Sequence, residues 1–288
     1  MDLINGVNMS VLVDAIGALS LGTGTAKTQL DGAKQGSASS YILPAACRAI
    51  LGIQPVFFET TPTADQTPVA TLKVESDDLG LQAYEVFAEP LVNAVATNDT
   101  VISPSSPIYP AYWPTKGGEQ VNFYGICQTA NTVAPLMGAN VYWSDSPGDL
   151  KEKPYRALVG GAAGAAGSGT STGTSTGSVP GANISVSGSS NKLIREIDGI
   201  LVNTTAAASK PLAGYMSLTA PELSYTVRAQ FEPSSGLLGT GQTITHLTRV
   251  KSLKVLCRSP STIATSLNLT TAPTTAGNFY NGILYNEV

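Results

Sequence analysis

The chain has 288 residues, enough for one large domain or for two domains of about 100–150 residues each. Charged residues make up only 12% of it, about half the usual share, and hydrophobic residues make up 42%. The net charge is −4 and no run of Lys or Arg occurs, which disfavours specific or general nucleic-acid binding as a main role. Small uncharged residues must therefore cover the surface. Such a surface can rest against copies of itself without burying unpaired charge, which favours an assembly subunit, although a secreted protein would fit the composition too.

Residues 1–40 are predicted to form an N-terminal arm with a short helix. Asn8 would cap a helix over residues 9–21, because the apolar residues of this stretch share one helical face: Val11, Leu12, Ala15, Ile16 and Leu19. The helix is too short to span a bilayer. It would either pack under the main body or serve as an arm that touches a neighbouring subunit or an internal membrane. No secretory signal is visible, which indicates synthesis in a cytoplasm.

The rest of the chain has the pattern of an all-β protein. Runs of β-branched and aromatic residues are broken by Pro, Gly, Asn and Asp about every ten residues, as in a sandwich or barrel. The strands predicted in the first half are 47–58, 68–75, 81–87, 119–130 and 139–143. Those predicted in the second half are 193–202, 215–218, 225–231, 244–256, 263–269 and 279–285. Between the halves, residues 160–178 contain only Gly, Ala, Ser and Thr, which predicts a linker or a long exposed loop.

An internal repeat indicates that the two halves are copies of one domain. The eight residues that begin at Cys127 return, similar and without a gap, as those that begin at Cys257. Other landmarks recur in the same order, as expected for a duplication with loop insertions. They are Arg48 with Arg195, Pro68 with Pro211, Glu89-Pro90 with Glu232-Pro233, and Val141-Tyr142-Trp143 with Ile283-Leu284-Tyr285. The predicted domains are the arm at 1–40, a first sandwich at 41–158, the linker or loop at 159–182 and a second sandwich at 183–288.

Residues of catalytic or metal-binding type are sparse. Cys47, Cys127 and Cys257 form neither a disulfide framework nor a CxxC pair, and we expect them to be small buried apolar residues. His246 is the single histidine, so it cannot supply a His-rich metal centre, and no Gly-x-Ser-x-Gly elbow frames a nucleophile. A strand histidine held by hydrogen bonds is the favoured interpretation. We therefore nominate no catalytic, cofactor-binding or metal residue and expect no cofactor.

Two clusters leave alternatives open. Glu75 with Asp77 and Asp78 could bind a hard cation such as Ca²⁺, or form a solvated turn before Gly80. The aromatic residues Tyr109, Tyr112 and Trp113 lie between prolines. They could stack on a sugar such as a receptor glycan, fill a partner's pocket, or plug the end of their own sandwich.

Together, the duplication, the N-terminal arm, the Gly/Ser/Thr/Pro-rich loops and the absence of a catalytic set resemble one family. It is the double jelly-roll major capsid proteins of the lineage of adenoviruses and of tailless membrane-containing phages and archaeal viruses. The resemblance covers residues 42–288 as architecture and rests on no diagnostic motif. The chain departs from the family in being near its small end, with little room for tower-like loops.

The resemblance implies two tandem jelly-roll β-sandwiches with a short N-terminal helical arm. It also implies a non-enzymatic subunit that forms a homotrimer, a pseudo-hexameric capsomer, in an icosahedral shell. Its partners would be itself, minor capsid proteins and an internal membrane reached by the arm, and its location the virion.

Three other functions remain open on the sequence. One is a different β-rich virion protein, either a single jelly-roll capsid protein or a tail-tube subunit. Another is a carbohydrate-binding or adhesin-like module that uses Trp113. The third is a hydrolase that uses His246.

Overall fold

The computed structural model describes the chain in segments. They are residues 11–24, 26–59, 70–88, 101–102, 108–127, 134–146, 154–162, 169–172, 183–186, 190–203, 214–221, 223, 226–230, 244–250, 253–269 and 278–288. Every regular element in these segments is a β-strand, and they form several antiparallel sheets. The predicted all-β class is confirmed.

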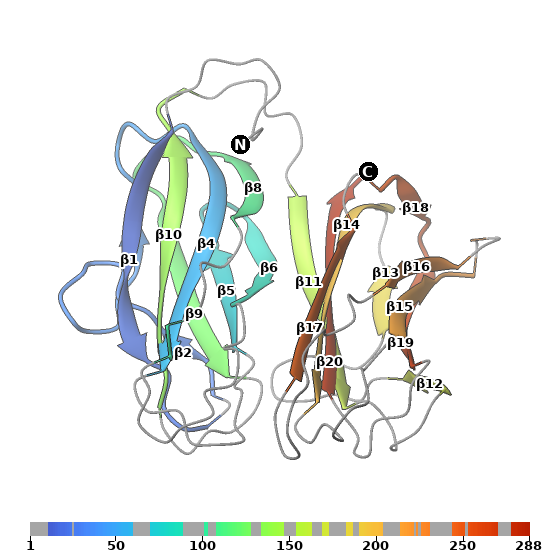
Figure 1. Ribbon diagram of the computed structural model, residues 1–288. Helices are drawn as coiled ribbons and strands as arrows, with labels where there is room; N and C mark the ends of the chain where they lie inside the picture. Colours follow the sequence, from blue (N-terminus) through green and yellow to red (C-terminus); the bar gives the residue numbers. More distant parts are fainter. Residues whose placement is uncertain are drawn as a thin grey trace. The chain divides into compact units, whose positions relative to one another are not determined.

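The chain divides into two compact units, both visible in Figure 1. Unit 1 contains the described residues up to Tyr155, apart from Val101, and unit 2 contains those from Arg156 to Val288. The predicted linker at 159–182 holds the end of β11 (Pro154–Ala162), most of which belongs to unit 2, and all of β12 (Gly169–Thr172).

The described strands of unit 1 lie in two antiparallel sheets. In the first, the strands lie in the order β1 (Leu12–Ser20), β10 (Leu136–Ser144), β4 (Ala49–Glu59) and β8 (Tyr109–Pro114). The two-residue strand β7 (Val101–Ile102) also pairs with β4. In the second, the order is β6 (Leu81–Phe87), β5 (Ala70–Ser76) and β9 (Gln120–Cys127). The outer neighbour of β9 is interrupted: β2 (Thr28–Gln29) and β3 (Tyr41–Ile42) pair with different parts of it.

Alternation along the strands explains why these sequences form sheets with one buried face. In β5, Leu72 and Val74 are fully buried, while the alternating residues Lys73 and Glu75 are half-buried on the opposite face. The largest fully buried side chains come from the strands of both sheets or from the segments beside them: Trp113, Tyr84, Phe57, Phe87, Phe123, Leu30, Leu43 and Ile50. The core of unit 1 is therefore made by the inner faces of its two sheets.

In unit 2, too, the described strands lie in two antiparallel sheets. The first runs β17 (Ile244–Val250), β14 (Lys192–Asn203), β20 (Asn278–Glu287) and β11, with β18 (Val255–Cys257) pairing β14 beyond the end of β17. The second runs β19 (Ser261–Leu269), β15 (Gly214–Thr219) and β16 (Val227–Gln230). On its other side, β19 pairs with β12 and with β13 (Asn183–Val186).

The two units share one strand order. We count the interrupted strands β2/β3, β12/β13 and β17/β18 once each and leave out β7, so that the described part of each unit has eight strands in chain order. In both units, one sheet then holds the first, eighth, third and sixth strands, in that order. The other sheet holds the second, seventh, fourth and fifth. Even the interruption of the second strand recurs.

The predicted helix at residues 9–21 is wrong where the structure describes it. Leu12–Ser20 is strand β1, which pairs antiparallel with β10 from Leu12 opposite Trp143 to Ser20 opposite Leu136. A helical apolar face would be buried as a whole, but Ile16 is buried while Leu12 is 40% exposed. Short apolar stretches fit both a helical and a strand period, and here the backbone hydrogen bonds to β10 favour the strand. Residues 9 and 10 lie outside the described part of the chain.

The landmarks of the repeat divide into three groups. Arg48 directly precedes β4 and Arg195 is the fourth residue of β14, and the Trp143 and Tyr285 segments lie in β10 and β20, which occupy matching places. The cysteines do not match. Cys127 ends β9 opposite Ala70, whereas Cys257 ends β18 opposite Lys192, one strand earlier in the order. The remaining landmarks, at Pro68, Glu89, Pro211 and Glu232, lie outside the described residues.

Candidate functional site

The three cysteines are buried, as predicted. Cys47, Cys127 and Cys257 are each 0% exposed and none forms a disulfide. Burial raises the pKa of the Cys47 thiol, although Thr115 Oγ1 donates a hydrogen bond to its sulfur at 3.3 Å. A protonated buried thiol is a poor nucleophile and a poor metal ligand.

His246 lies in the middle of β17, where its backbone pairs with Leu201 of β14. This places the residue in a strand, as predicted; its side chain lies outside the described part. Among the described residues, no group of three or more His, Cys, Asp or Glu side chains is arranged to hold a metal ion.

The carboxylates at 75–78 do not converge. Asp77 and Asp78 form a turn that ends at Gly80, whose φ of 59° is the left-handed conformation that glycine adopts easily. Gly80 N donates to Asp77 O at 2.9 Å, and Asp78 Oδ2 accepts from Gln120 N at 2.8 Å. The two side chains border a polar pocket of about 120 Å³ with Gln120 and Asn122. Glu75 is not in its lining, and the arrangement is that of a turn.

The aromatic residues of β8 have separate environments. Trp113 is 0% exposed and Tyr109 is 3% exposed, whereas Tyr112 is half-buried. The Trp113 ring meets Tyr84 edge-to-face, with ring centroids 4.7 Å apart, and Tyr84 OH donates to the carbonyl of Pro110. The Trp113 side chain therefore fills space in the core of unit 1, and it is not exposed to bind a sugar.

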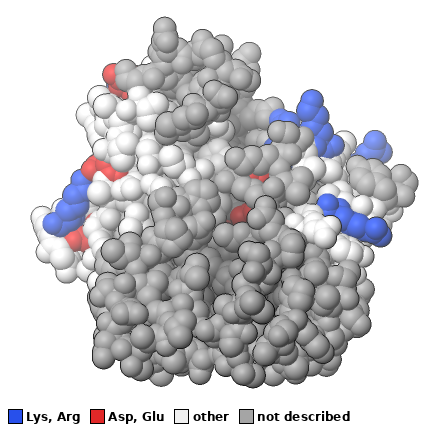
Figure 2. Space-filling view, viewed as in Figure 1, with Lys and Arg blue, Asp and Glu red and all other residues white. Residues whose placement is uncertain are grey.

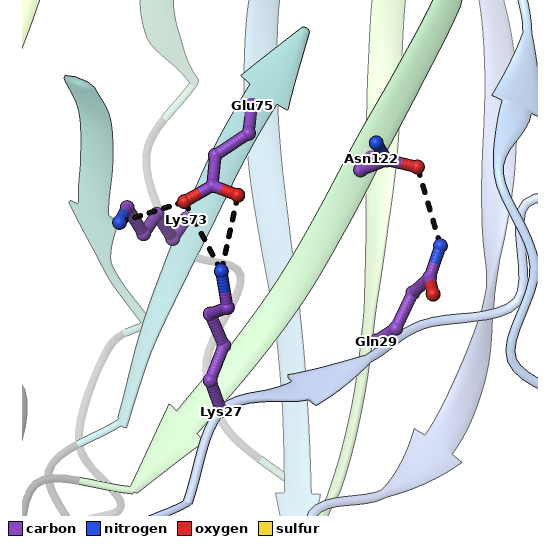
Figure 3. A network of polar contacts seen from close by, with 5 residues as sticks. All are labelled: Lys27, Gln29, Lys73, Glu75 and Asn122. Atoms are coloured by element: carbon purple, nitrogen blue, oxygen red, sulfur yellow. Dashed lines mark hydrogen bonds and ion pairs between the residues drawn. The ribbon is translucent and has the colours of Figure 1, made fainter. Parts of the chain in front are cut away.

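The outer face of the second sheet of unit 1 is charged (Figure 3). Glu75 lies between two lysines, with Lys73 Nζ 2.7 Å from Oε1 and Lys27 Nζ 3.0 Å from Oε2. Lys27 also lies 4.0 Å above the centre of the Tyr124 ring. Partial burial raises the pKa of Glu75, but the bonds from both lysines outweigh it and lower the pKa. The charged side chains on this face thus form ion pairs with one another while they remain in contact with water.

Among the described residues, the outer face of the first sheet of unit 1 carries no charge. Side chains that share this face follow from the pairing of β1, β10 and β4: Val13 with Tyr142, Ala15 with Asn140 and Gln54, and Val56 with Gly138. Asn140 Nδ2 and Tyr142 OH both donate to Gln54 Oε1, at 3.1 and 2.9 Å. Figure 2 shows the described atoms over these strands as largely uncharged, with the charged groups at the margin.

We call these six residues the neutral face: Val13, Ala15, Gln54, Val56, Asn140 and Tyr142. It was not predicted from the sequence. A usable signal existed, because residues 49–58 and 136–144 contain no Asp, Glu, Lys or Arg. A strand with one face in water would normally carry some charge on that face.

No family model matches the sequence, and no curated protein matches it. Solved structures give distant likenesses. The mosquito-larvicidal Cry4Aa toxin from Bacillus thuringiensis shares 10% identity, over 97% of this chain and 58% of the toxin chain, at a TM-score of 0.22. The Macrobrachium rosenbergii nodavirus structure shares 7% identity, over 98% of this chain and 92% of the other, at a TM-score of 0.19. At these scores neither likeness carries an argument, so the function must be inferred from the strands and faces of this chain.

Proposed function

We propose that this chain is a viral major capsid protein, a structural subunit of a virion shell without a catalytic step. The observation that carries the proposal is the strand order shared by the two units. It is the order of an eight-stranded jelly roll, in which two Greek keys place the first strand beside the last and wrap the chain into two sheets. The proposed architecture is two jelly rolls in tandem.

Tandem jelly rolls have a clear use in a shell. Three chains, each with two similar lobes, can fill a six-fold-like lattice position while keeping the closed symmetry of a homotrimer. Such pseudo-hexameric capsomers would tile an icosahedral shell, each chain touching several others. The low charge content of 12% supports this, because extensive lateral contacts would bury few ions.

The described chemistry gives no support to the catalytic and sugar-binding alternatives. The cysteines are buried, and the carboxylates at 75–78 serve a turn and an ion pair. The aromatic side chain nominated for a glycan, Trp113, is fully buried.

Two partner assignments remain part of the proposal. Minor capsid proteins would bind between capsomers, and an internal membrane would be met by the start of the chain. Of the arm at residues 1–40 that was expected to make this contact, residues 1–10 lie outside the described part and residues 12–20 form β1. No helix among the described residues is long and apolar enough to cross a membrane.

The native mass in solution tests the proposal directly. Analytical ultracentrifugation of the full chain should find a stable species near three times the chain mass of 29.6 kDa. Electron microscopy at high protein concentration should show hexagonal tiles or closed shells. A strict monomer at the highest attainable concentration would refute the capsomer.

A further inference from the structure

The two outer faces of unit 1 are built for different surroundings. On the second sheet, Glu75 and two lysines form ion pairs whose side chains remain 28–40% exposed, an arrangement suited to water. On the first sheet, no described side chain that β1, β10 and β4 turn outward is charged. A sheet face left in water gains nothing from this absence, whereas a face buried by a partner avoids the cost of desolvating ions.

The polar side chains of the neutral face hydrogen-bond to one another, as buried polar groups do. Gln54 Oε1 accepts from both Asn140 and Tyr142, so these side chains hold one another in position. Around them are apolar side chains in contact with solvent, with Val13 56% and Val56 38% exposed. Exposed apolar groups around an ordered amide and phenol are typical of a protein contact surface.

The edge of the sheet extends the neutral face. β1 is the outermost strand, and Val11, Leu12 and Val13 follow one another there at 44%, 40% and 56% exposed. Edge strands are usually protected by lysine, proline or an outward charge. The one charge on β1, Asp14, is instead engaged by Tyr41 OH at 3.0 Å and by Lys34. This ion pair stays partly exposed beside the edge, with the Lys34 side chain 47% and the Asp14 side chain 28% exposed, so the part of the edge open to apolar contact is residues 11–13.

We propose that the neutral face, with the adjoining edge of β1, is the surface through which unit 1 binds a second copy of this chain. The inference rests on the proposed function and deepens it by assigning the contact. A charged partner would find no opposite charge on this face and would have to bury its own ions without compensation. A copy of this chain offers an equally uncharged surface, including the neutral face itself.

Two lysine substitutions with a matched control test the assignment. Val13→Lys places a charge on the neutral face, and Val56→Lys does so from another strand. Ile42→Lys in β3 is the control, since Ile42 belongs to the other sheet and is 56% exposed, as Val13 is. Circular dichroism and thermal unfolding establish that each variant is folded. Sedimentation equilibrium then measures self-association of the full chain.

We expect both neutral-face variants to weaken self-association by about tenfold or more, since a charge buried in an interface without a partner lowers the affinity by at least that factor. The Ile42→Lys variant should associate like the natural chain. Equal association of all four proteins would overturn the contact while leaving the shell subunit intact. A natural chain that never associates would instead remove the proposed function. Binding of the natural chain to phosphatidylcholine vesicles, lost in Val13→Lys without any change in association, would assign the face to a membrane and overturn the inference.

Discussion

Trp113 is the largest fully buried side chain of the protein, and its contact with Tyr84 ties β8 to the opposite sheet. We expect Trp113→Ala to cost about 3–5 kcal/mol of unfolding free energy, because it removes an aromatic contact and leaves a cavity. Chemical denaturation followed by fluorescence or circular dichroism measures this cost. Ile42→Ala, at a 56% exposed position, should change stability by about 0.5 kcal/mol or less. A Trp113→Ala protein of unchanged stability would contradict the burial of the indole ring.

The buried carboxylate of Asp31 organises the loop that joins β2 to β3. Its backbone pairs with Gly17 of β1, and its side chain accepts from Ser39 Oγ at 2.8 Å and from the N–H of Gly36. Burial raises the pKa of Asp31, but these hydrogen bonds, with those from the N–H groups of Lys34 and Ser37, outweigh it and lower the pKa.

Because the pKa of Asp31 is lowered in the folded protein, its contribution to the free energy of unfolding depends on pH. The stabilisation is complete above the ordinary aspartate pKa of about 3.9 and is lost as the pH falls through the lower folded value. Unfolding free energies measured from about pH 6 to pH 3 should therefore fall less steeply in Asp31→Asn than in the natural chain. At about pH 6, the Asp31→Asn variant should be less stable than the natural chain. Parallel pH curves would show that the Asp31 carboxylate does not stabilise the loop.

At the scale of elements, the position of β1 depends on a close approach to β10. A Cβ added to Gly138 would lie 2.9 Å from the carbonyl oxygen of Ile16 and 3.4 Å from Ala18 Cβ. Gly138→Ala must therefore shift β1, and we expect it to cost about 1–3 kcal/mol. Gly24→Ala is the matched control, because nothing lies within 4 Å of the added Cβ, and it should be nearly neutral. Equal stabilities of the two variants by denaturant unfolding would mean that β1 is not packed on β10.

The cysteine segments show how a sequence match can mislead about elements. Cys127 and Cys257 begin similar eight-residue segments, yet one ends β9 and the other ends β18. Both positions demand a small buried side chain at a strand end. Similar local demands produced similar residues at places that do not correspond in the strand order.

At the scale of the whole molecule, an uncharged contact surface predicts assembly that resists salt. Ion pairs between exposed groups are screened at about 1 M salt, where the Debye length falls to about 3 Å, whereas apolar contacts are not weakened. We expect the oligomer to persist, or to strengthen, between about 0.05 and 1 M NaCl. Light scattering or sedimentation across this range measures it, and dissociation at high salt would show that charged groups hold the copies together.

The sequence by itself determined the β class, the burial of the cysteines and the occurrence of two β-rich halves. These properties follow from composition and from the alternation of apolar residues, which are local and survive any arrangement of the strands. The sequence left the burial of Trp113 open, as one of the alternatives for the aromatic cluster. The sequence misassigned Leu12–Ser20, because a nine-residue stretch that is mostly apolar satisfies both a helical and a strand period.

Tertiary structure alone decided the rest. The strand order shared by the two units depends on which distant segments pair, and pairing energies are non-local. The neutral face also exists only after folding, since β1, β10 and β4 are far apart in the chain and become one surface through their register. Residues without charge in three separate segments mean little in the sequence; side by side they form a surface that a second copy can cover.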